Sequence, residues 1–444
     1  MLPLKTPREK IIRKKTAPVI LIMFNTFVWY LLLYAIFNNM ITSLSVTGTD
    51  KLSLFACYYL GVAVTAVIGA KFFSGAKSSF LQFWLFLGAT ATILLFAFSD
   101  NMIVNFFLAS FVGASIGLGL PSCLSYFADS TSIESRGIVG GITWGIVGLT
   151  VVAFAVLISM LGLFEAILLV TGWRLFGSVC FPFLDRFNKK PEVTKAPSYS
   201  VIIRKRELLL YLFPWVMFSL VNFAEQPMLG KVFGTQTFAF VQLVEFLFVG
   251  IFAIVGGAVA DIAGRKRVVI AGFIMLGIEY ASMSVFAGTS DILYLFLTLD
   301  GITWGLFFSV FLSVIWGDIG GNYEKEKFYV LGGVPFLLGG LLSIIIQPFA
   351  QNIPTGTAFS LASFFLFVAV IPLMYAPETL PEKTMKDREL KNYLEKAQKF
   401  AQKQAEKSQH AGSKKNRETK ESDDENEQDP NEYEEARKLA EKYY

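Results

Sequence analysis

The sequence predicts an all-α polytopic membrane protein. We expect twelve transmembrane helices in two pseudo-repeated six-helix bundles, followed by a polar tail that is partly helical and partly disordered. Hydrophobic residues make up 54% of the 444 residues and charged residues only 17%. The charges lie in short segments between apolar runs, each long enough to cross a hydrocarbon core of roughly 30 Å. Gly140, Gly141 and Gly148 also recur as Gly332, Gly333 and Gly340 at one constant offset, as expected of a duplicated bundle.

Twelve apolar runs are the candidate spans. They cover residues 17–42, 52–71, 78–98, 102–127, 137–160, 162–184, 208–228, 236–260, 268–288, 291–316, 328–350 and 355–376. An even number of spans places both chain ends on one side of the membrane. The loops on that side are rich in Lys and Arg, whereas those on the other side hold only Lys51 and Lys231. We therefore expect a multi-pass protein of the plasma membrane with both termini in the cytoplasm.

The polar segments between and after the spans divide the chain into five parts. We expect a basic cytoplasmic N-terminal arm, a first bundle, a cytoplasmic linker, a second bundle and a charged cytoplasmic tail, at residues 1–16, 17–184, 185–207, 208–376 and 377–444. Within the tail, leucines and alanines at helical spacing predict a helix over 388–407. The segment 408–431 has almost no apolar residues, so we expect it to be disordered.

Residue types exclude several kinds of chemistry. The three cysteines all lie inside apolar runs, and the one histidine, His410, lies in the polar tail. We expect no metal site, no cofactor and no enzymatic activity, because no metal-ligand spacing, nucleophile motif or phosphate-binding loop occurs. The net charge of +4 lies in loops and tail and does not indicate a nucleic-acid partner. We expect a monomer in the lipid bilayer, with no partner of the tail identified.

A short basic stretch between the eighth and ninth spans carries a recognisable pattern. Gly257, Asp261, Gly264, Arg265 and Lys266 follow the order Gly, three residues, Asp, two residues, Gly, Arg, Lys. This pattern resembles the loop signature of the major facilitator superfamily. Two further stretches fit the same family, and the resemblance covers about 1–385. The first of these two stretches is the fourth and fifth spans, with Gly113, Gly117, Pro121, Asp129, Glu134, Arg136 and Gly137. The second is the Pro-Glu-Thr sequence at 377–379, which directly follows the last span and which we call the Pro-Glu-Thr exit.

The resemblance implies a charged cluster that closes the cytoplasmic side. Asp261 is expected near the start of the fifth span, where its charge favours the helix N-terminus. Arg265 is expected to pair with Asp318, and Arg136 with Glu134 is expected to complete the cluster. The first-half loop has Phe72 where the family signature has Asp, and the fifth span lacks a Gly-Pro antiporter motif, which argues against the drug-efflux subclass.

Charge inside a membrane span indicates function. In the resembling family, spans one, four, seven and ten line a central cavity and spans two, five, eight and eleven flank it. This ranks Asp300, Glu245 and Glu225 as the best cavity residues. Polar and aromatic side chains on the same spans are the expected substrate contacts, namely Asn25, Trp29, Asn222, Gln226, Gln242 and Trp304. Arg174 and Glu279 fall on supporting spans, and we interpret them as structural.

The sequence thus predicts a secondary active transporter that moves a small polar or amphipathic solute by alternating access. We expect proton coupling through Asp300 and Glu245, because a carboxyl group held away from water can exchange a proton near neutral pH. Two alternatives remain, a uniporter of the same fold and a transporter-like receptor that signals through its tail. Sugars, organic acids, amino acids and amphipathic drugs all remain open as substrates.

Overall fold

A computed structural model describes residues 7–73, 77–184, 194–289 and 291–381, together with four isolated tail positions. Its regular structure is helical, apart from a single β-bridge between Thr194 and Tyr323. Among the described residues, twelve helical segments are long and apolar enough to cross a membrane. The predicted fold class is therefore confirmed. The predicted tail segments 388–407 and 408–431 lie outside the described residues, apart from those four positions.

The first six spans are built from helices α1 to α8. Their bounds are α1 Pro7–Ser43, α2 Gly48–Phe72, α3 Lys77–Ile93 with η1 Leu94–Ala97, α4 Met102–Gly117, α5 Leu120–Ser130, α6 Arg136–Ser159, α7 Leu163–Phe176, η2 Gly177–Cys180 and α8 Phe181–Leu184. The fourth span is thus broken into α4 and α5, which the sequence pattern did not predict. Pro121 explains the break, because proline has no N–H to donate and is favoured in the first turn of a helix.

The last six spans are built from helices α10 to α16. After the short helix α9 Tyr199–Ile203, the bounds are α10 Arg206–Phe233, α11 Thr235–Ala263, α12 Arg265–Phe286, α13 Ile292–Leu306, η3 Phe307–Ile315, α14 Trp316–Gly320, α15 Glu326–Ile346, η4 Ala350–Asn352 and α16 Thr355–Tyr375. The tenth span runs through α13, η3 and α14, and η3 is a π-helix. Such segments are rare and occur often at functional sites.

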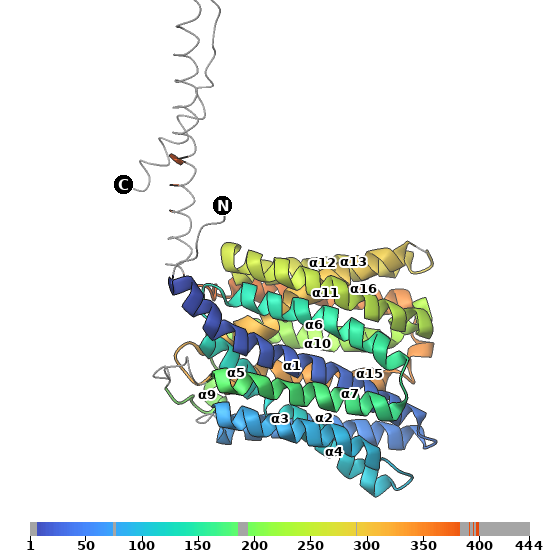
Figure 1. Cartoon of the computed structure of the whole chain (residues 1–444). Helices are drawn as coiled ribbons and strands as arrows, with labels where there is room; N and C mark the ends of the chain where they lie inside the picture. Colours follow the sequence, from blue (N-terminus) through green and yellow to red (C-terminus); the bar gives the residue numbers. More distant parts are fainter. Residues whose placement is uncertain are drawn as a thin grey trace, which may run out of the picture. The chain divides into compact units, whose positions relative to one another are not determined.

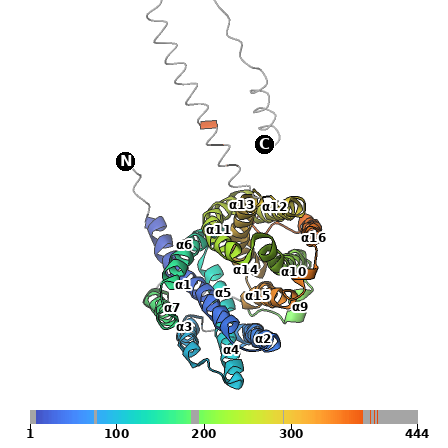
Figure 2. The same cartoon turned by 90° about the vertical axis from the view of Figure 1, so that its right-hand side faces the viewer.

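The long helices run alongside one another and form two groups (Figures 1 and 2). We call helices α1–α8 the first half and helices α10–α16 the second half. Figure 2, which looks along the helices, shows α6 beside α11 and α2 beside α15, and these two pairs make the main contacts between the halves. Close packing of α6 on α11 requires glycine, because a Cβ at Gly137 would collide with the Gly257 carbonyl and one at Gly141 with Ala253.

Many large apolar side chains remain exposed on the outer surface of the bundle. Examples are Ile103, Leu149, Ile251 and Phe364, which come from four different spans. Continuous apolar surface of this kind fits a hydrocarbon environment. Below, the terminal side is the end of the bundle at which α1 begins and α16 ends (left in Figure 1, where α1 begins), and the far side is the other end.

Candidate functional site

The loop signature forms a tight helix-to-helix turn on the terminal side. Gly264 has φ +100°, a conformation that glycine adopts without steric cost, so α12 can begin immediately at Arg265. The Glu378 carboxylate accepts hydrogen bonds from the backbone N–H groups of Arg265 (2.8 Å) and Lys266 (3.2 Å). It thereby satisfies donors that the start of α12 leaves free. The Lys266 ammonium donates to two carbonyl groups at the end of α16, so Lys266 joins elements of the second half only.

Asp261, at the end of α11, reaches across to the other half. Its carboxylate accepts hydrogen bonds from the backbone N–H groups of Gly137 (3.0 Å) and Ile138 (2.8 Å), in the first turn of α6. The acid is only 4% exposed. A negative charge at this helix N-terminus is favourable, and the contact matches the position that the family resemblance implies.

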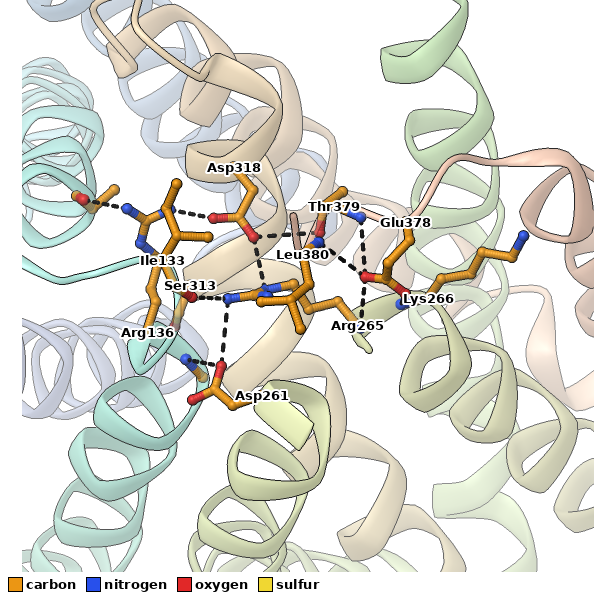
Figure 3. Close-up of polar contacts among 12 residues, drawn as sticks. Ile133, Arg136, Asp261, Arg265, Lys266, Ser313, Asp318, Glu378, Thr379 and Leu380 are labelled. Atoms are coloured by element: carbon orange, nitrogen blue, oxygen red, sulfur yellow. Dashed lines mark hydrogen bonds and ion pairs between the residues drawn. The ribbon is translucent and has the colours of Figure 1, made fainter. Parts of the chain in front are cut away.

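Asp318, at the end of the tenth span, is held by two arginines (Figure 3). It pairs with Arg136 of the first half and, at 2.7 Å, with Arg265 of its own half. Arg265 also donates to the carbonyl group of Ile133 in the first half and lies 3.4 Å from Asp261. The expected pairing of Arg265 with Asp318 is therefore present, and the same acid also pairs with Arg136.

A second ion pair joins the halves nearby. The Lys325 ammonium lies 2.5 Å from a carboxylate oxygen of Asp129, and both side chains are about nine-tenths buried. We call Asp129, Arg136, Asp261, Arg265, Asp318 and Lys325 the ionic cluster. Because its charges are largely dry, separating any pair leaves an unpaired buried charge. The ionic cluster therefore favours contact between the halves on the terminal side.

The sequence missed two residues of this region. Lys325 is an ordinary loop lysine in the sequence, and only folding brings it beside Asp129. Glu378 belongs to the Pro-Glu-Thr exit, which the sequence did single out, but its capping of α12 could not be read from that motif. Glu134, in contrast, is exposed, and Arg136 takes Asp318 as its acid partner.

A cavity of about 490 Å³ lies between the two halves. Its described lining comes from α1, α2, the fourth span, α6, α10, α11, the tenth span and α15, and none of it comes from α3, α7, α12 or α16. This is the division between inner and supporting spans that the resemblance implies. The lining reaches Asn38 of α1, Ala155 of α6 and Phe238 of α11 toward the far side. The lining also includes Tyr329 and Val330 near the terminal-side start of α15, so the cavity runs along much of the interface between the halves.

One stripe of the tenth span organises the cavity wall. Phe296, Asp300, Trp304, Phe308 and Leu312 follow one another at four-residue intervals, and all five line the cavity. This spacing keeps them on one face of the helix. Along this stripe Asp300 lies between Phe296, which is nearer the far side, and the rings of Trp304 and Phe308, which are nearer the terminal side.

Two carboxyl groups meet in the cavity wall. Glu245 of α11 and Asp300 of the tenth span both line the cavity and interact electrostatically with each other, and Trp304 follows Asp300 by about one helical turn. Two ionised carboxyl groups in such a buried wall would repel each other, so the Glu245–Asp300 pair favours holding one proton and a single negative charge.

Further polar atoms near this pair lack partners. Oδ1 of Asp300 and Nδ2 of Asn222 have no hydrogen-bond partner among the described residues, although both residues line the cavity and are at least 95% buried. Behind the wall, both carboxyl oxygens of the fully buried Glu279 are also unpartnered, and Glu279 interacts electrostatically with Asp300 and Glu245. Its interpretation as a purely structural residue stays a prediction.

Six of the nine predicted cavity residues line the cavity, and three do not. Those in the lining are Asp300, Glu245, Asn222, Gln226, Gln242 and Trp304. Asn25 instead donates to the carbonyl group of Trp173, and Trp29 donates to Thr92, both inside the first half. Glu225 is 7% exposed and faces Tyr280 inside the second half. These three residues therefore lie outside the cavity lining. Helical spacing shows which residues share a face but not which face points inward.

On α1 the cavity face is the one that carries Phe27, Tyr30, Leu31 and Tyr34. The opposite face holds Arg174 of α7 in the interior of the first half. Its guanidinium carbon lies 4.1 Å from the Trp29 ring and 4.3 Å from the Trp84 ring, and it donates to Asn25 and Thr26.

Solved structures of known transporters are similar to this chain. The human organic anion transporter MFSD10 (TETRAN) aligns with 16% identity and a TM-score of 0.58, over 83% of this chain and 100% of its own. A variant of the E. coli fucose:proton symporter FucP aligns with 12% identity and a TM-score of 0.66, over 81% of this chain and 98% of its own. FucP in the outward conformation, described as a major facilitator superfamily transporter, aligns with 12% identity and a TM-score of 0.67, over 82% of this chain and 99% of its own. No family model matches the chain, and no curated protein matches it.

These likenesses define the class of architecture. The chain is a multi-pass helical membrane protein with two packed six-helix halves. More particularly, it has the fold of the major facilitator superfamily transporters, as the loop signature predicts.

Proposed function

We propose that this protein is a secondary active transporter that moves a small polar or amphipathic solute across the plasma membrane by alternating access. One observation carries the proposal: a largely apolar cavity with a few polar groups in its wall lies between two halves, and the buried ion pairs that join these halves among the described residues lie on the terminal side. In this arrangement the solute enters from the far side, where no buried ion pair joins the halves among the described residues. Opening the ionic cluster while the far side closes would release the solute on the terminal side, which the basic loops assign to the cytoplasm.

Proton coupling is part of the proposal and rests on the Glu245–Asp300 pair. Both acids line the cavity, and two neighbouring carboxyl groups in a buried wall favour holding one proton between them, so the same group can meet both the proton and the solute. The fucose:proton symporter shares the fold, which supports the proposal without identifying this chain's solute. A uniporter of the same fold is the alternative, and it predicts transport that no proton gradient can drive uphill.

Distances between spin labels test alternating access without knowledge of the solute. One pair of labels goes to the far side, on cysteines that replace Asn39 of α1 and Gln236 of α11, and another to the terminal side, at Ser132 and Arg267. All four positions are exposed. Cys57, Cys123 and Cys180 are first replaced by serine or alanine. We expect each pair to sample two distances, with the far-side pair shortening under the conditions in which the terminal-side pair lengthens. Pairs that stay fixed, or that lengthen together, would rule out alternating access.

A further inference from the structure

The charge of the cavity restricts its ligand. Two acids, Glu245 and Asp300, line it, while the lining that comes from described residues includes no Lys, Arg or His. The buried cations of the bundle are engaged elsewhere, since Arg136, Arg265 and Lys325 pair with acids of the ionic cluster. Arg174 lies between two tryptophan rings outside the lining. An anionic ligand would therefore meet like charge in a dry site, with no cation to compensate it.

An aromatic floor lies beside these acids and spans both halves. The Trp144 ring of α6 lies 4.4 Å from Phe27 of α1 and stacks on Phe308 of the tenth span at 4.2 Å. Trp304 lies 4.9 Å from Phe308 and 5.7 Å from Phe336. All five rings line the cavity. Their faces attract cations, and their area buries an apolar body.

Unpartnered atoms indicate what is missing from this site. Buried polar atoms are normally satisfied, yet Oδ1 of Asp300, a residue of the cavity lining, is buried and has no partner among the described residues. A positive charge or a donor on a ligand would satisfy it. Nδ2 of Asn222 is a free donor in the same wall, and it suits a ligand oxygen such as a hydroxyl or carbonyl.

From these contacts we infer that the transported solute is an organic cation with an apolar, aromatic-sized body. Its charge lies at the Glu245–Asp300 pair and its body lies on the aromatic floor. The inference rests on the proposed function and names its substrate class. The inferred solute is opposite in charge to that of the structural neighbour MFSD10, an organic anion transporter. Binding of an organic anion calls for cationic groups in the cavity.

Cation and proton compete at this pair. With the shared proton in place the pair carries one negative charge, and a bound cation favours loss of that proton. The other titratable groups around the pair are Glu279 and Tyr280 on α12 and Glu225 on α10, and no basic group faces it among the described residues. The cation should therefore bind more tightly as the pH rises, and it should exchange for a proton.

Ligand binding to the purified full-length protein tests whether the cavity prefers cations to anions and neutral molecules of the same shape. Tetraphenylphosphonium and tetraphenylborate have the same shape and opposite charge, and benzyltrimethylammonium has the neutral isostere neopentylbenzene. We expect both cations to bind, more tightly at about pH 7.5 than at about pH 5.5, and neither the borate nor the neutral isostere to compete. Equal binding of the borate, failure of both cations, or displacement of a bound cation by hexoses would overturn the inference.

Variants test whether cation binding depends on the Glu245–Asp300 pair itself or only on the overall charge of the protein. Because Asn and Gln can still donate to the remaining acid, Asp300→Asn and Glu245→Gln should each keep cation binding but lose its pH dependence. The double variant should bind at least about tenfold more weakly. Glu165→Gln, which removes an exposed acid outside the cavity, should behave as wild type. Unchanged binding in the double variant would also overturn the inference. If the spin labels report alternating access while the cations fail, the substrate class alone is wrong.

Discussion

Among the described residues of the membrane interior, Arg174 of the first half is buried with no acid beside it, whereas Glu225, Glu245, Glu279 and Asp300 of the second half have no cation beside them. In the first half, two indole faces and two side-chain oxygens surround Arg174. In the second half, Glu245 and Asp300 reach the cavity, and Glu225 and Glu279 lie behind it with unpartnered oxygens. An arginine keeps its charge, while a carboxyl group in a dry site can be neutralised by a proton. The comparison suggests that the first half uses buried charge for packing and the second half uses it for titration.

Removing the cavity acid should produce the largest effect. We expect Asp300→Asn to abolish accumulation of benzyltrimethylammonium in proteoliposomes driven by an acid interior, because the remaining Glu245 no longer shares a titrating proton. The cation should still bind, so uptake down its own gradient should persist. Labelled-cation uptake with and without the pH gradient measures both. Glu165→Gln is the control, and full accumulation in Asp300→Asn would remove this acid from the coupling mechanism.

On the other side of the comparison, Arg174→Met should mainly destabilise the protein. The substitution removes two cation–π contacts and two hydrogen bonds, a loss on the order of 2–4 kcal/mol. Glu279→Gln should change stability by less than about 1 kcal/mol, because it replaces a buried acid without a partner by a neutral group of the same shape. Thermal unfolding midpoints in one detergent give the comparison. If Glu279→Gln proved the more destabilising change, the assignment of packing and titration to the two halves would be reversed.

Some of this organisation could be predicted from the sequence, for physical reasons that particular residues illustrate. The spans follow from apolar length, and the turn at Gly264 follows from a local pattern in which glycine, acid and cations are adjacent. The pairing of Arg265 with Asp318 followed from a family resemblance. Lys325 with Asp129 and Glu378 with the start of α12 are contacts between distant segments, and no local pattern specifies them.

Inside the membrane, the sequence indicated which charges are costly but not where they point. Asp300 and Trp304 line the cavity, whereas Asn25 and Trp29, with the same four-residue spacing, face the interior of the first half. The difference lies in the rotation of each helix about its axis. Packing of Trp29 against Arg174 sets that rotation for α1, and the partner comes from a helix more than one hundred residues further along the chain.

The ionic cluster should respond more weakly than the cavity acids, because several contacts share the work of closing the terminal side. Asp261→Asn keeps the shape and can still accept a hydrogen bond, but it removes the charge at the start of α6. A loss of about 1–2 kcal/mol would shift the population of closed and open terminal sides by about five- to thirtyfold. We expect the terminal-side labels at Ser132 and Arg267 to move apart and the far-side labels to approach. An unchanged distribution would show that Asp261 does not bias the equilibrium.

Truncation after Met385 should have the smallest effect on transport and separates the transporter from the receptor alternative. The cavity and the ionic cluster are complete within residues 7–381, and residues 1–385 form a compact unit by themselves. Cation binding and proton-driven uptake should therefore survive removal of residues 386–444, with rates close to those of the full chain. A receptor that signals through its tail would instead keep cation binding but give no uptake in either form of the protein. Binding and uptake measured on the same two preparations distinguish these outcomes, because a folding defect would lower both together.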